Sequence, residues 1–306
     1  MATPQDRQVS QAELLAEAAE VIPLRQASLW GDAWRRLLKN KLAVFGLATV
    51  ILLCSIALFA PLIAPYGEAE VVHFQLALET PSWYFPMGID QNGRDMFSRM
   101  VYGARVSLLV GVVAQIIVLG IGVPVGAIAG FYSGRVDNAL MRVVDVFYAI
   151  PQLLLVLLLV NMLGPGMKNI FIAIGVTGWV TMARLVRGVM LANREQEYIK
   201  ASRVAGGGSG YIIIRHMLPN SLTPIVVALT FGIPQAIFIE ASLSFVGVGI
   251  RPPQPSWGQM VGTGQQYIQS VQHMMIFPCL AIALTMLAFT FLGDGLRDAL
   301  DVKMNE

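Results

Sequence analysis

The sequence predicts an all-α, polytopic membrane protein with six transmembrane helices. Its 306 residues are 56% hydrophobic and only 13% charged, whereas soluble domains carry about 25% charged residues. The mean hydropathy of +0.64 is too high for a water-soluble fold of this length to bury its apolar surface. This composition excludes a disordered chain, a secreted disulfide scaffold and an ordinary cytosolic enzyme.

Six apolar runs are long enough to cross a bilayer, which takes about 20 mostly apolar residues in a helix. They cover residues 42–64, 106–134, 146–167, 169–183 and onward past Arg184, 217–250 with Glu240 inside, and 274–293. Runs of this length are too continuous for the strands of an outer-membrane barrel. We therefore expect 42–64 to be the first transmembrane helix and 104–293 to hold the other five.

The distribution of Lys and Arg predicts that both termini are cytoplasmic. With the N-terminus inside, the outer segments hold Arg94, Arg99, Arg105, Lys168 and Arg251, which leaves sixteen of the 21 basic residues on the inner side. Inner segments of membrane proteins carry such an excess. We accordingly expect a cytoplasmic tail over 1–24, an external loop over 65–103 and a second cytoplasmic tail over 294–306.

An amphipathic helix is expected over 25–41, ahead of the first span. Trp30, Trp34, Leu37 and Leu38 fall on one helical face, and basic residues lie beside them. Such a helix lies in the membrane interface with its tryptophans at headgroup depth. The alternative is a charged flank that only follows the excess of basic residues on the inner side.

The second span carries a row of glycines. Gly122, Gly126, Gly130 and Gly134 recur at every fourth residue and leave one helical face bare. Because lipid provides no hydrophobic drive for helix association, such a face favours close packing of a second helix. We prefer this interpretation to a groove that lines a pore.

Glu240 is the one acidic residue well inside an expected span. A charge at the bilayer centre costs about 2.5–3.5 kcal/mol on insertion scales, so this side chain is expected to face protein or water. It is a candidate residue of a transport pathway. Pairing with a neighbour and a position near the outer interface remain alternatives.

The polar block 88–99 is expected to be an ordered part of the external loop. Asn92 and Gly93 favour a turn. Asp95 and Arg99 are four residues apart, so they are expected to pair across one helical turn. We interpret this block as a lid or a subunit contact, with a direct substrate contact of Arg94 or Asp95 as the alternative.

The loop 194–219 between the fourth and fifth spans has a distinct pattern. A short helix beginning near Glu197 and Tyr198 is followed by the glycine break 206–208, and a second apolar and basic helix reaches Pro219. The small residues of the first helix suit insertion into a groove on another protein.

At these residues a resemblance to a known family becomes visible. The order of Ala201, Ser202, Gly206, Leu218 and Pro219 resembles the coupling motif of permease subunits in binding-protein-dependent ABC importers. The blocks 88–99, 240–247 with 251–258, and 293–301 resemble the dipeptide, oligopeptide and nickel branch of that family. The four blocks stand in the family's order, and the resemblance runs from about residue 34 to residue 301.

The resemblance implies the fold of a type I ABC importer permease in the cytoplasmic (inner) membrane of a bacterium or archaeon. It implies half of a pathway for peptides, a second related permease subunit, two cytoplasmic ATPase subunits and an external binding protein. Carried over by position, the residues that couple this chain to the ATPase are Glu197, Tyr198, Ala201, Ser202 and Gly206. Nickel and glutathione-like cargoes stay open as alternatives.

The chain itself is not expected to be an enzyme. It has no Gly-x-x-x-x-Gly-Lys-Ser/Thr run for binding ATP, and His73, His216 and His273 are scattered without paired ligands. We expect no cofactor, no metal and no nucleic-acid partner, with lipid as the surrounding partner. An ion-coupled secondary transporter would need several buried acids and inverted repeats, so it ranks below the importer, as does a structural scaffold.

Overall fold

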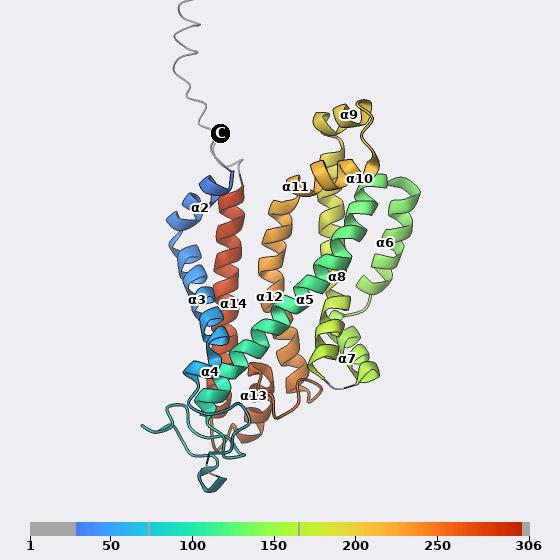
Figure 1. The fold of residues 1–306 in the computed structure, drawn as a ribbon. Helices are drawn as coiled ribbons and strands as arrows, with labels where there is room; N and C mark the ends of the chain where they lie inside the picture. Colours follow the sequence, from blue (N-terminus) through green and yellow to red (C-terminus); the bar gives the residue numbers. More distant parts are fainter. Residues whose placement is uncertain (1–28, 73, 165, 302–306) are drawn as a thin grey trace, which may run out of the picture.

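The computed structural model describes residues 29–72, 74–164 and 166–301 (Figure 1). The expected tail 1–24, the first residues of the expected interfacial helix, 25–28, and residues 302–306 lie outside the described residues. The helices of the described part are α2 (Leu29–Lys39), α3 (Lys41–Leu58), α4 (Ala60–Ile63), η1 (Phe74–Leu76), α5 (Met96–Tyr132), α6 (Gly134–Tyr148), α7 (Gln152–Leu163), α8 (Met167–Arg194), α9 (Glu197–Val204), α10 (Ser209–Tyr211), η2 (Ile212–Met217), α11 (Leu218–Asn220), α12 (Leu222–Phe245), α13 (Trp257–Gly264), η3 (Gln265–Tyr267) and α14 (His273–Leu300).

The all-helical membrane fold is confirmed. Within the described residues, α3, α5, α8, α12 and α14 are each long and apolar enough to cross a membrane, and α6 with α7 adds a sixth span if this bent pair is counted as one. The span expected over 146–167 is not one straight helix, because α6 and α7 meet at an angle of 83°. Pro151 stands at the break, where it removes a backbone donor and blocks helix continuation. The 12 residues of α7 span only about 18 Å, less than the bilayer core of about 30 Å.

Helix α5 crosses the whole bundle diagonally (Figure 1). Its 37 residues correspond to about 55 Å, longer than an upright span needs. It begins at Met96, inside the stretch 65–103 expected as external loop, because Asp95 caps the helix by accepting the Ser98 N–H at 2.7 Å. At the other end of the chain, α14 extends to Leu300, well into the expected tail 294–306.

The glycine row of α5 packs against α8. A Cβ added at Gly122, Gly126 or Gly130 would lie within 2.4–2.8 Å of α8 atoms, including the backbone oxygens of Ala183 and Arg187. The packing interpretation is therefore confirmed for these three glycines. Gly134 does not take part, since it begins α6 and has nothing within 4 Å of its added Cβ. The two helices thus form a closely packed pair.

Replacing Gly126 with leucine should destabilise the protein. The new Cβ would lie 2.4 Å from the carbonyl oxygen of Ala183, so the α5–α8 pair must separate, and overpacking of this kind lowers the free energy of unfolding by about 1–3 kcal/mol. The measurement is thermal unfolding of the purified protein in lipid nanodiscs. Gly120→Leu is the matched control, because Gly120 lies on the open face of the same helix with no atom within 4 Å. Equal midpoints for the two variants would contradict the packing.

Helices α2, α3 and α14 form a second group at the side of the bundle (Figure 1). Leu37 of α2 is 2% exposed and lies in one apolar cluster with Ala43 and Ala299. Trp34 and Leu38, also on α2, stay about half exposed. A helix lying in the membrane interface needs such an apolar surface, and the interfacial position of α2 stays a prediction. Helix α2, the last turn of α14 and α9 all lie at the same end of the bundle (Figure 1).

Candidate functional site

Helix α9 stands at one end of the bundle, beyond the end of α8 (Figure 1). The structure brings the five residues expected to couple to an ATPase together on this helix and its C-terminal turn. Glu197, Tyr198, Ala201 and Gly206 are exposed, and Ser202 is partly exposed. Val204 on the same helix is 91% exposed. Within this chain α9 therefore presents a free surface that a partner can reach.

The opposite side of α9 is held firmly by the bundle. Ile199 is 0% exposed and belongs to an apolar cluster with Phe131 of α5 and Met190 of α8. The Arg203 guanidinium lies 5.3 Å from the centre of the Phe131 ring, within cation–π range. The Asn220 amide donates to the Tyr198 hydroxyl at 3.3 Å and to the His216 carbonyl at 2.7 Å. These contacts attach α9 to the neighbouring ends of the long helices.

Gly206 ends α9 in a defined turn. Its φ of +83° lies in the left-handed region, where a residue with a Cβ is strained. The Gly207 N–H donates to the Ser202 carbonyl at 2.9 Å, and the Gly206 N–H donates to the Arg203 carbonyl at 3.0 Å. This hydrogen-bond pair is the Schellman motif, which satisfies the last carbonyls of a helix. The direction of the chain after α9 therefore depends on Gly206.

Polar contacts join the long helices at the α9 end. Arg187 of α8 makes two hydrogen bonds to Asp137 of α6, at 2.5 and 2.7 Å. Asn193, near the end of α8, donates to the Ser221 hydroxyl at the start of α12 at 3.1 Å. Arg194 donates to the hydroxyl of Ser133, between α5 and α6. These contacts join the ends of α5, α6, α8 and α12 to one another beside α9.

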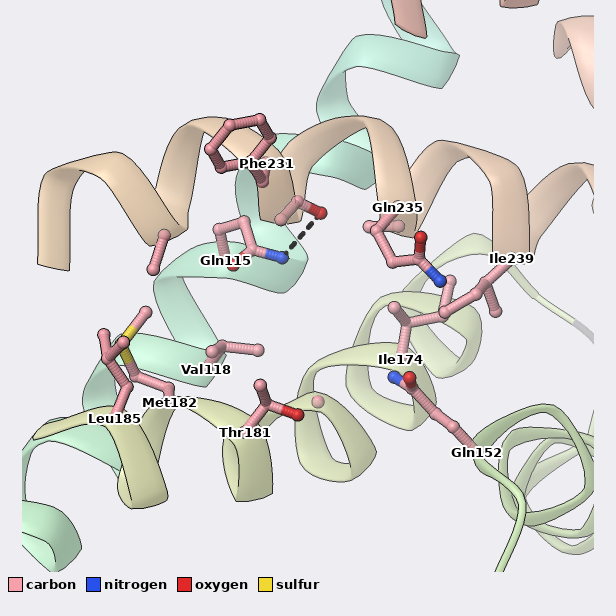
Figure 2. Close-up of a pocket in the computed structure, with 14 residues that line it drawn as sticks. Gln115, Val118, Gln152, Ile174, Thr181, Met182, Leu185, Phe231, Gln235 and Ile239 are labelled. Atoms are coloured by element: carbon pink, nitrogen blue, oxygen red, sulfur yellow. Dashed lines mark hydrogen bonds between the residues drawn. The ribbon is translucent and has the colours of Figure 1, made fainter. Parts of the chain in front are cut away.

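Between α5, α8 and α12 lies a cavity of about 350 Å³ (Figure 2). Its polar lining consists of Gln115 from α5, Thr181 from α8, Gln235 from α12 and Gln152 from the first residue of α7. Figure 2 shows these four side chains around one common space. The Gln115 amide donates to the Gly232 carbonyl of α12 at 2.9 Å. A Cβ at Gly232 would lie 2.4 Å from Gln115 Oε1, so the missing side chain makes room for this contact.

Three of these polar residues lie at the middle of their helices. Gln115, Thr181 and Gln235 are close to the midpoints of α5, α8 and α12, which places them near the centre of the membrane. Thr181 and Gln235 are exposed in this chain. Polar side chains at that depth do not face lipid, because hydrocarbon cannot satisfy their hydrogen bonds. This face of the bundle therefore meets water or another protein.

Glu240, the expected pathway residue, points from α12 toward α13. It is 0% exposed, and its Oε1 accepts hydrogen bonds from the hydroxyls of Ser244 and Ser256, both at 2.8 Å. Ser256 also caps α13 by accepting the Gln259 N–H at 3.0 Å. Glu240 is not among the residues that line the cavity. Its contacts tie α13 to α12, and a role in the pathway stays a prediction.

The expected Asp95–Arg99 pair is wrong. Asp95 is the N-cap of α5, and its carboxylate accepts from the backbone N–H and the hydroxyl of Ser98. Arg99 turns instead to Asp90, with 3.5 Å between Nε and the carboxylate, and donates to Gln259 Oε1 of α13 at 2.9 Å. The side chains of Arg99 and Asp90 are both 4% exposed. This buried pair connects the lobe ahead of α5, residues 64–72 and 74–95, to α5 and α13.

Sequence reasoning missed the cavity residues. Gln115, Thr181 and Gln235 each lie within long apolar runs, and the signal that would have found them is a polar residue at the middle of a span.

In the described part of the chain, no group of three His, Cys, Asp or Glu side chains lies close enough to hold a metal ion.

The comparisons with known proteins agree on one family. Residues 122–306 match the model described as binding-protein-dependent transport system inner membrane component, and residues 28–79 match the N-terminal TM domain of oligopeptide transport permease C. The dipeptide transport system permease protein DppC of Bacillus subtilis is 45% identical over 89% of this chain and 85% of its own length. The oligopeptide transport system permease protein OppC of the same species is 41% identical over 94% of both chains.

Two further similarities extend this result. The glutathione transport system permease protein GsiD of Pectobacterium atrosepticum is 40% identical over 90% of this chain and 91% of its own length. Among solved structures, the inward-facing MetNI methionine ABC transporter matches with a TM-score of 0.56 and 22% identity, covering 67% of this chain and 97% of that chain. At this identity the structural match shows the fold alone.

Proposed function

Because this chain belongs to the binding-protein-dependent transport system inner membrane components, we propose that it forms half of the translocation pathway of an ATP-driven peptide importer. It is a multi-pass component of the inner membrane, and it is not itself the ATPase. The peptide cargo rests on relatives named for dipeptide, oligopeptide and glutathione transport, at 45%, 41% and 40% identity.

The transporter works with ATPase and binding-protein partners. In the proposal, two ATPase subunits bind the α9 end from the cytoplasm, and an external binding protein delivers cargo at the α13 end. The excess of basic residues on the inner segments supports this orientation. A second, related permease subunit would enclose the pathway on the side where Thr181 and Gln235 are exposed, because lipid cannot satisfy the hydrogen bonds of these side chains.

One observation supports the coupling role most strongly: α9 is exposed in this chain and also packs in one apolar cluster with α5, α8 and α12, three of the helices that line the cavity. In the proposal, Ala201 and Ser202 allow a close approach to the ATPase, and Gly206 fixes the turn. Glu197 supplies a negative charge at the helix N-terminus, and Tyr198 connects α9 to Asn220. ATP-driven closure of the ATPases then moves α5, α8 and α12 between two bundle states. This coupling is reciprocal, so cargo must also bias ATP hydrolysis.

Uptake by the reconstituted complex tests the function. The chain, its second permease subunit and the ATPases are placed in liposomes, and uptake of a labelled dipeptide, an oligopeptide, glutathione and Ni²⁺ is followed. The proposal predicts peptide uptake that requires both internal ATP and the external binding protein. Uptake driven by an ion gradient without ATP would contradict it and favour a secondary transporter. Uptake of Ni²⁺ alone would contradict the peptide cargo and leave the importer class intact.

A further inference from the structure

We infer that four cavity residues form a neutral passage for a peptide: Gln115, Gln152, Thr181 and Gln235. They form hydrogen bonds with the main chain of the peptide and do not select for the charge of its side chains. This inference rests on the proposed peptide cargo. It concerns how the membrane part of the transporter treats that cargo, which neither the family nor the relatives' names describe.

The first observation is the absence of charge from the lining. In the described part of the chain, the residues that line the cavity are apolar, amide-bearing or hydroxyl-bearing, and none is charged. The helices around the cavity do carry charged residues, but these contact other elements. Arg184 pairs with Asp145 of α6 at 2.5 Å, Arg187 pairs with Asp137, and Glu240 faces α13.

The second observation is that the amides are available. Within the described chain, the amides of Gln152 and Gln235 have no hydrogen-bond partner. The NH₂ group of Gln115 is used by the Gly232 carbonyl, which leaves its Oε1 as an acceptor directed at α12. The amide nitrogen of Gln152 lies 3.6 Å from the position that a Cβ of Gly178 would take. The Gln152 side chain therefore lies against the surface of α8 at Gly178, where α8 has no side chain. The lining therefore offers both donors and acceptors.

The chemistry of an amide matches that of the peptide bond. Each glutamine side chain carries two donors and one acceptor oxygen, and each peptide unit carries one donor and one acceptor. A fixed charge at this depth would act in a low-dielectric setting, so it would bind oppositely charged peptides tightly and exclude peptides of the same charge. A pathway must bind cargo weakly enough to release it. Neutral amides meet this requirement for peptides of any side-chain charge.

The experiment introduces a charge into the passage of the complete reconstituted complex. Initial uptake of Ala-Ala-Ala, Ala-Lys-Ala and Ala-Glu-Ala is measured with saturating binding protein, and each rate is divided by the wild-type rate for the same peptide. This ratio cancels the selectivity of the binding protein. We expect Gln235→Glu to lower uptake of Ala-Glu-Ala about tenfold relative to Ala-Lys-Ala, and Gln235→Lys to reverse that preference. Gln235 is exposed, so both substitutions have room in this chain.

A matched control and a second position complete the design. Gln269→Glu adds the same charge at an exposed position outside the cavity, and all three ratios should stay near one. If a Gln235 variant does not assemble, Thr181→Asp provides the same test on α8 and should also disfavour Ala-Glu-Ala. Equal slowing of the three peptides, or no slowing, would overturn the neutral passage. If the wild-type complex imports none of the three, the proposed function fails instead.

Discussion

Replacing Gly206 with valine should lower peptide uptake by about tenfold to hundredfold while the protein still inserts and assembles. Gly206 has a φ of +83°, and a β-branched residue held there is strained by about 1–3 kcal/mol. The Schellman turn must then open, which turns α9 away from the position in which, in the proposal, it meets the ATPase. Strain of about 1–3 kcal/mol lowers the fraction of transporters whose α9 is in position for coupling by about tenfold to hundredfold. The measurement is peptide uptake and ATP hydrolysis by the same liposomes.

Gly208→Val is the matched control for this prediction. Gly208 lies two residues further along the same loop with extended backbone angles of −68° and 153°, and nothing lies within 4 Å of an added Cβ. The control adds the same side chain without the strain, so it should retain most of the uptake. If both variants import peptide at the wild-type rate, Gly206 has no role in coupling.

Arg99→Ala should loosen the lobe of residues 64–72 and 74–95. Arg99 is buried against Asp90 and Gln259, and it also donates to the carbonyls of Glu68 and Pro253 at 3.3 and 3.4 Å. Asp90 keeps its ion pair with Arg94 at 3.1 Å, so the cost comes from the acceptors that lose Arg99, Gln259 Oε1 and the two carbonyls. Leaving buried acceptors without a donor costs about 1–3 kcal/mol. The lobe should therefore become sensitive to limited proteolysis, and the free energy of unfolding should fall by that amount.

Arg105→Ala serves as the control for Arg99. It removes the same side chain six residues further along α5, at an exposed position. This control should leave both proteolysis of the lobe and the unfolding midpoint unchanged. Equal behaviour of the two variants would show that the Arg99 contacts do not stabilise the lobe.

The spans and the short helix α9 were predictable because their signals are local. A run without charges, such as 274–293, identifies a span by length and polarity alone, and the glycine row of α5 identifies a close helix contact. The segment Glu197–Val204 combines a polar helix start, small residues and a glycine end. Each of these patterns depends on neighbouring residues, so one sequence suffices to recognise it.

The features that differ from the sequence prediction depend on which of several nearby partners a residue contacts in the fold. The spacing of Asp95 and Arg99 fits an ion pair on a helix, but Asp95 is the residue at which α5 begins, so its carboxylate binds the free N–H of Ser98 instead. Asp90, ahead of the helix, then takes Arg99. The span expected over 146–167 breaks at Pro151, and its charge-free run does not show the 83° angle between α6 and α7 that brings α7 against α8.

The cavity was missed because its signal is not local. Gln115, Thr181 and Gln235 are far apart in the sequence, and each is an isolated polar residue in an apolar run. Only their common depth and the crossing of α5, α8 and α12 bring them to one space (Figure 2). Glu240 was a candidate pathway residue because it is a charged residue inside a span. In the structure its carboxylate accepts a hydrogen bond from Ser256, the N-cap of α13.

The most direct test of the account asks which protein α9 touches. Cys54 and Cys279 are replaced with alanine, and Ser202→Cys then carries a photo-activated cross-linker in the assembled complex. The matched control is Asp298→Cys, which is exposed near the end of α14 at the same end of the bundle (Figure 1). The account predicts a strong adduct between position 202 and an ATPase subunit, and far less from position 298. An adduct at 202 that stays within this chain, or one no stronger than that at 298, would contradict it.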